Sequence, residues 1–98
     1  MDEPAVAAFV RYAGVCASRL GEDPRDPDAL FALAAVLAVA ERWRETLEVL
    51  DLLSKGTPRY PGLWEFKARA YRELGDAPME ALCHEAAARE ARALAPPR

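Results

Sequence analysis

The sequence predicts an all-α fold of about five antiparallel helices in one domain, and three observations support this. The segment Pro24–Pro27 recurs 34 residues later as Pro58–Pro61, and the residues that follow each copy align. Alanine, leucine, glutamate and arginine, which favour helices, dominate the composition. No alternating run of β-branched residues predicts a strand. The chain is therefore expected to consist of helix–turn–helix units.

The first two helices are predicted from their start and stop signals. The first helix is expected over residues 4–20, because Pro4 is acceptable in a first turn and Gly21 ends the apolar pattern. The second is expected over residues 27–40, where the side chain of Asp26 can cap the free amide groups of the first turn.

The remaining three helices follow from the same kind of signal. The third is expected over residues 43–55 and ends before Gly56, and the fourth is expected over residues 61–74 and ends before Gly75. The fifth is expected over residues 78–94, since the paired prolines that follow cannot continue a helix.

The repeat can be followed position by position. Large, small and large apolar residues match in the two copies: Leu30 with Trp64, Ala34 with Ala68, and Leu37 with Tyr71. The small residue lets two helices approach closely, and the large ones fill the space between units. We expect the second turn to be one residue longer than the first, so that residues 45–47 align with residues 80–82.

This pattern resembles the tetratricopeptide repeat, a 34-residue helix–turn–helix unit. In the second copy five residues fill places of the family's motif: Trp64, Ala68, Tyr71, Gly75 and Ala81. The resemblance covers about residues 24–96 and implies a short right-handed α-solenoid. It divides the chain into an N-terminal helix (1–23), a first repeat (24–57) and a second repeat with a C-terminal capping helix (58–98).

The chain departs from the family's motif at several positions. Glu41 stands at the usual turn glycine, Lys67 stands at a usual leucine, and Glu85 falls where a large apolar residue is expected. The last helix is therefore expected to be a cap with a polar outer face. The first helix resembles the second half of a unit, because its apolar residues precede the apolar face of the third helix by 34 positions: Phe9, Ala13 and Cys16.

In such a solenoid the first helix of each unit lines the concave face. The resemblance places on it an apolar set from the first repeat and a charged set from the second, and these residues are the predicted partner-binding site: Phe31, Ala35, Ala38, Val39, Glu65, Arg69 and Arg72. The function this implies is a protein–protein interaction module that binds a peptide or helix of a partner protein on its concave face. On this hypothesis Arg69 and Arg72 pair with acidic groups of the partner.

The second predicted helix is apolar around its whole circumference, which leaves three interpretations open. An ordinary surface helix has only one apolar stripe, whereas residues 29–40 are all apolar. The helix is either buried by its neighbours, open as a groove for a guest, or used in self-association as a homo-oligomer. The alternative function is therefore an obligate small subunit or a secretion-type tetratricopeptide chaperone that stabilises one partner. The lysine and asparagine clamp with which family members grip chaperone tails is missing, since the chain has no asparagine.

Composition and charge narrow the class of partner. A formal net charge of −3 argues against a nucleic-acid partner, which requires a surplus of basic residues on one face. The longest apolar run has 12 residues, fewer than the roughly 20 that a membrane helix needs. The acidic start of the chain is unlike a secretory signal, and Cys16 and Cys83 have no metal-binding or disulfide spacing. We expect a cytoplasmic protein with no membrane span.

No arrangement of residues in the sequence predicts catalysis. There is no glycine-rich phosphate loop and no acid–base pair in a pocket-like setting. Glu80 and His84 are four residues apart on one helical face, but two ligands without a third make a weak metal site. The chain is expected to be no enzyme and to hold no metal or cofactor.

Overall fold

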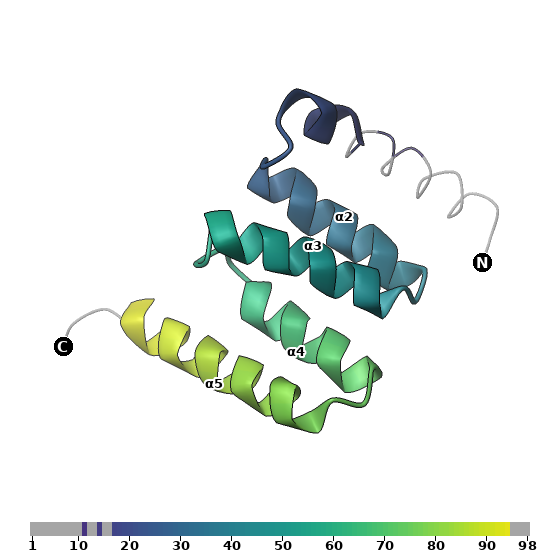
Figure 1. The fold of residues 1–98 in the computed structure, drawn as a ribbon. Coiled ribbons are helices and arrows are strands. Elements are labelled where there is room, and N and C mark those ends of the chain that lie inside the picture. Colours follow the sequence, from purple (N-terminus) through teal and green to yellow (C-terminus); the bar gives the residue numbers. More distant parts are fainter. Residues whose placement is uncertain (1–10, 12–13, 15–16, 95–98) are drawn as a thin grey trace.

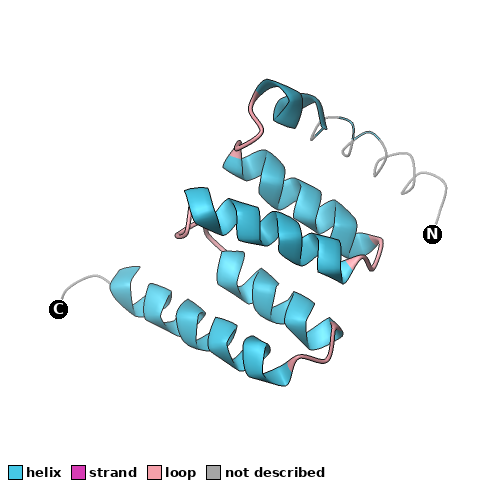
Figure 2. Cartoon of the chain, in the orientation of Figure 1, coloured by secondary structure: helices cyan, strands magenta, loops and turns pink. Residues whose placement is uncertain are grey.

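Helices and short turns make up the described part of the chain. The computed structural model describes residues 11, 14 and 17–94. Within these residues every regular element is a helix, and no strand is present (Figure 2). The predicted all-α fold class is thereby confirmed. The predicted start of the first helix and its apolar residues Phe9, Ala13 and Cys16 lie outside the described residues.

Four helices follow a helical segment over residues 17–22. They are α2 (Pro27–Val39), α3 (Trp43–Gly56), α4 (Leu63–Glu73) and α5 (Ala77–Leu94). Each packs against the next along the chain, and neighbours run in opposite directions (Figure 1). Turns of three residues join α2 to α3 and α4 to α5, so the structure contains two helical hairpins that meet where α3 packs on α4.

The core lies between the two hairpins. Five buried side chains form one cluster: Leu30, Ala34, Leu50, Leu53 and Leu63. Leu50 and Leu63 have no exposed surface, and Ala34, the small residue of the first repeat, has none either. Its place opposite α3 fits the close approach that the sequence predicted for that position. Leu20 packs against this cluster from the preceding helical segment.

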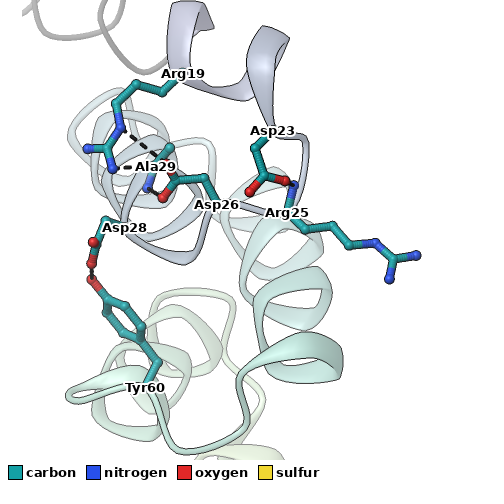
Figure 3. Close-up of polar contacts among 7 residues, drawn as sticks. All are labelled: Arg19, Asp23, Arg25, Asp26, Asp28, Ala29 and Tyr60. Carbon is teal, nitrogen blue, oxygen red and sulfur yellow. Dashed lines mark hydrogen bonds and ion pairs between the residues drawn. The ribbon is translucent and has the colours of Figure 1, made fainter.

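A carboxylate fixes the start of α2, as the sequence predicted. Asp26 Oδ1 accepts a hydrogen bond from the backbone N–H of Ala29 at 3.2 Å, and Asp26 Oδ2 lies 2.9 Å from a guanidinium nitrogen of Arg19 (Figure 3). The bond from the Ala29 amide, assisted by Arg19, holds the pKa of Asp26 below its usual value. The cap therefore also ties residues 17–22 to α2.

The start of α5 corrects the predicted register of the second repeat. Asp76 Oδ1 accepts from the N–H of Met79 at 3.2 Å, so α5 begins at Ala77, 34 residues after the first residue of α3. The two turns are equal in length, and the extra residue predicted in the second turn is not there. Leu82, expected to be buried like Leu47, is 55% exposed, and the buried residue is its neighbour Cys83.

Lys67, the departure from the family's usual leucine, is buried between α3 and α4. Its Nζ lies 2.8 Å from Asp51 Oδ1 and 4.8 Å from the centroid of the Trp64 ring. The aliphatic stem packs in the interface while the charge reaches a carboxylate that remains half exposed to water. An ion pair thus occupies a position where leucine would supply apolar contact.

Glu41 has a left-handed backbone conformation in the α2–α3 turn. Its φ is 60°, and Gly75, at the same place in the second turn, has a φ of 76°. A residue with a Cβ loses about 1 kcal/mol in this conformation relative to glycine. Glu41→Gly should therefore raise the free energy of unfolding by about 0.5–1 kcal/mol in urea titrations.

Gly75→Ala serves as the reverse control for the Glu41 prediction. A Cβ at Gly75 would meet no atom within 4 Å, so its effect on stability reports the backbone conformation alone. We expect Gly75→Ala to lower the free energy of unfolding by about 1 kcal/mol. A loss of stability in Glu41→Gly would contradict the strain argument.

Candidate functional site

An open hollow of about 600 Å³ lies where the end of α2 and the following turn face α4. Eight residues line it: Ala38, Val39, Glu41, Trp43, Glu65, Phe66, Arg69 and Glu73. Its volume falls in the range of ligand sites, roughly 300–1,000 Å³, although it is open to solvent along its length. We call this surface the α2–α4 hollow.

The apolar part of the α2–α4 hollow comes from the last turn of α2 and two aromatic rings. Val39 is 56% exposed, the largest exposed fraction among the large apolar side chains described. Trp43 and Phe66 are half-buried beside it. Because α2 is apolar on every side, packing one side against α3 leaves another without a partner inside the described chain.

Arg69 makes its contacts within the α2–α4 hollow. Its Nε lies 3.2 Å from Glu73 Oε1, one helical turn further along α4, and its guanidinium carbon lies 5.7 Å from the centroid of the Trp43 ring. A cation above an aromatic ring at an exposed site gains about 0.5–1 kcal/mol. The side chain of Arg69 is thus held against α3, with 61% of its surface still exposed.

Two carboxylates in the α2–α4 hollow have no cation beside them. Within residues 17–94, no ion pair or hydrogen bond engages the side chain of Glu41 or Glu65. The nearest basic residue along the turn, Arg42, pairs with Glu45 at 2.7 Å. With three glutamates and one arginine lining it, the hollow carries two net negative charges.

The structure brings together four of the seven residues predicted to bind a partner: Ala38, Val39, Glu65 and Arg69. Ala35 is half-buried in α2, and Arg72 is exposed on α4, but neither lines the hollow. Phe31 lies elsewhere along α2.

Phe31 is part of a ring cluster between the two hairpins. Its ring centroid lies 4.9 Å from that of Tyr60 and 5.5 Å from that of Phe66, which it meets edge to face. It also packs against the buried core cluster. The Tyr60 hydroxyl donates a 2.6 Å hydrogen bond to Asp28 Oδ1, as Figure 3 shows. These contacts make Phe31 a packing residue of the repeat interface.

Sequence reasoning missed three residues of the hollow: Glu41, Trp43 and Phe66. Glu41 was noted only for departing from the turn glycine, and Trp43 was expected to anchor the core. A usable signal existed at Trp43, since the second repeat has a small residue, Ala77, at the equivalent helix start. Phe66 carried no such signal, because its place depends on how α4 packs on α2.

A second pair of hollows, each about 260 Å³, lies at the α4–α5 end of the structure. Trp64, Arg59 and Glu90 line both, with alanines of α5 around them. Glu90 Oε1 is buried and has no hydrogen-bond partner among the described residues. One repeat earlier, the residues equivalent to Trp64 and Glu65 are Leu30 and Phe31, which the start of the second hairpin covers.

The described residues hold no cluster of three or more potential metal ligands. Glu80 Oε2 lies 3.2 Å from the His84 Nε2 atom, and both lie on α5, where His84 is well exposed. This pair stabilises one face of the helix by a few tenths of a kcal/mol at about this spacing. A membrane-spanning helix is likewise not found within the part of the chain described here.

Cys83 is a buried free thiol in α5, with 3% of its surface exposed. Burial raises the pKa of the Cys83 thiol, and Asp51 raises it further against the opposing effect of Lys67. Because the thiolate is the reactive form, we expect Cys83 to be inert in the folded chain at neutral pH. In a Cys16→Ser variant, Ellman's reagent should react at least about a hundredfold more slowly than in urea, since attack requires opening. Fast stoichiometric labelling of the folded variant would contradict this.

No family model matches the chain, and neither a curated protein nor a solved structure matches it. The function is therefore inferred from the residues of the two surfaces described above and from the repeat in the sequence.

Proposed function

We propose that the chain is a peptide-binding module in which the two hairpins are degenerate tetratricopeptide-like units of a short right-handed solenoid. The α2–α4 hollow is then its concave binding face, and it holds a peptide or helix from a partner protein. The 34-residue period of the helix starts, the caps and the left-handed turn residues supports the repeat. The proposed setting is the cytoplasm, where a free thiol such as Cys83 stays reduced.

The observation that carries this proposal is the exposed Val39 beside two aromatic rings. An apolar side chain more than half exposed, grouped with Trp43 and Phe66 in one hollow, is typical of a docking surface rather than of a solvated helix end. Aromatic residues in a concave setting also tend to supply much of the binding energy of a peptide interface.

Peptide selection followed by calorimetry tests the proposal. Peptides are selected from a displayed library against the whole chain, and their affinities are measured for the original chain and for Val39→Glu. We expect Val39→Glu to weaken binding at least about tenfold, because it places a charge in the apolar part of the hollow. Circular dichroism should show unchanged helix content, since Val39 is exposed.

Leu82→Glu is the matched control for Val39→Glu. Leu82 is 55% exposed, like Val39, but lies on α5 and does not line the α2–α4 hollow. The selected peptides should bind this variant as they bind the original chain. Equal binding to both variants, or a failure to select any peptide, would contradict the proposed function.

A second function, that of an obligate subunit or a secretion-type chaperone, is favoured by the α4–α5 end. The surface around Trp64 and Glu90 matches the one that the second hairpin covers in the first repeat, and it includes an unpartnered carboxylate oxygen. Sedimentation velocity over a hundredfold concentration range tests its self-associating form. Concentration-dependent dimers that Ala91→Arg abolishes would support it, because Ala91 is exposed in this hollow. A monomer at every concentration would argue against self-association.

A further inference from the structure

We propose that the occupant of the α2–α4 hollow is a cationic segment of a partner protein, with lysine or arginine side chains beside an apolar anchor. This inference rests on the proposed peptide-binding function and adds the chemistry of the peptide. It reverses the charge preference that the sequence predicted, in which Arg69 and Arg72 pair with acidic groups.

The charges of the α2–α4 hollow lie along one side of α4. Glu65, Arg69 and Glu73 are spaced four residues apart and line the same hollow, so they form a stripe about 12 Å long at 1.5 Å per residue. Glu41 joins them from the α2–α3 turn. A guest of about two helical turns, or of three to four extended residues, would match this length.

The one cation of the stripe is already neutralised. Arg69 pairs with Glu73 and lies over the Trp43 ring, contacts that an acidic guest would have to disrupt before using it. Arg72 is exposed outside the hollow and cannot replace it there.

The free charges of the hollow are therefore negative. Glu41 and Glu65 have no cation beside them among residues 17–94, so an acidic guest meets two like charges and a basic guest meets two opposite ones. Opposite charge at the rim of an interface mainly raises the rate of association and excludes partners of the wrong sign. Charge complementarity selects the basic segment.

The apolar lining decides where the basic side chains go. Val39, Trp43 and Phe66 accept an apolar anchor, and they lie in the same hollow as the two free carboxylates. A lysine or arginine next to that anchor can lay its aliphatic stem on the rings and reach a carboxylate with its charged end. The fitting motif is thus an apolar residue with a basic residue three or four positions away on a helix.

Two designed peptides measure the charge preference directly. Both are 14-residue amphipathic helices on a leucine and alanine frame, one with four lysines and one with four glutamates, each carrying a fluorophore. Fluorescence anisotropy with the whole chain at low salt should give an affinity at least about tenfold higher for the lysine peptide. The difference should shrink as salt is raised, because the charges are exposed.

Charge reversal locates the preference in the hollow. Glu41→Lys combined with Glu65→Lys should bring the two affinities to within about threefold or reverse their order. The matched control is Glu48→Lys combined with Glu85→Lys, which changes the net charge equally at exposed glutamates outside the hollow. The control should keep the preference for the lysine peptide, and both doubles should keep the helix content of the original chain.

The outcomes separate this inference from the proposed function. If both peptides bind equally and Val39→Glu weakens both, the hollow binds peptides without regard to charge and the inference is wrong. The inference also fails if the control double loses the preference as the hollow double does, because net charge then explains it. If Val39→Glu leaves all peptide binding unchanged, including that of peptides selected from a library, the proposed function itself fails.

Discussion

Leu50→Ala is expected to lower the free energy of unfolding by about 3 kcal/mol. Leu50 has no exposed surface and lies in the buried cluster with Leu30, Leu53 and Leu63. Removing a fully buried leucine side chain costs about 2–5 kcal/mol, through lost transfer energy and the cavity left behind. A domain of this length has a total stability of about 5–15 kcal/mol, so the variant should lose much of it. Urea titration followed by circular dichroism measures the difference.

Leu52→Ala is the control for Leu50→Ala. Leu52 lies two residues further along α3 and is 47% exposed, so the same change should alter stability by no more than about 0.5 kcal/mol. Equal losses in the two variants would contradict the described packing of α3, because they would require both side chains to be buried.

Phe31→Ala is expected to lower the free energy of unfolding by about 2 kcal/mol. The Phe31 ring contacts the rings of Tyr60 and Phe66 and joins the core cluster, so its removal opens the interface between the two hairpins. The expected loss is below the roughly 3–5 kcal/mol of a fully buried phenylalanine, because Phe31 is half-buried. For a domain of this size it should lower the melting temperature by about 8–16 °C.

Two controls make the Phe31 result informative. Phe31→Leu keeps most of the apolar volume and should recover about half of the lost stability. Val39→Ala, at an exposed position of the same helix, should change stability by no more than about 0.5 kcal/mol. If Phe31→Ala keeps full stability and only weakens peptide binding, Phe31 is a binding residue, as the sequence first predicted.

The helices could be predicted closely because their signals are local. The Asp26 cap, the position of α2 and the spacing of the turns each depend on a few neighbouring residues. The register of α5 was wrong for a related reason. Pro78 was taken as the first helical residue, whereas the Asp76 cap starts the helix at Ala77 and leaves Pro78 in the first turn, where its missing N–H costs nothing.

The candidate site could be predicted only in part, because a helix that is apolar on all sides does not show which side is covered. Ala38 and Val39 were placed in the site together with Glu65 and Arg69, and the hollow contains them. Phe31 was placed there as well, yet α4 and the preceding turn bring Tyr60 and Phe66 against it. The pairing of Arg69 with Glu73 could be expected from their spacing, but its contact with Trp43 crosses between helices.

The sequence by itself determined that the described chain is helical, where its helices turn, and that two units repeat every 34 residues, because capping, turn conformation and periodicity act over a few residues. The tertiary structure alone decided which apolar residues of α2 stay exposed, that Phe31 packs between the hairpins, and that the α2–α4 hollow is left with two free carboxylates. The physical reason is that burial and charge pairing depend on which helices lie side by side, and contacts between distant residues set that arrangement.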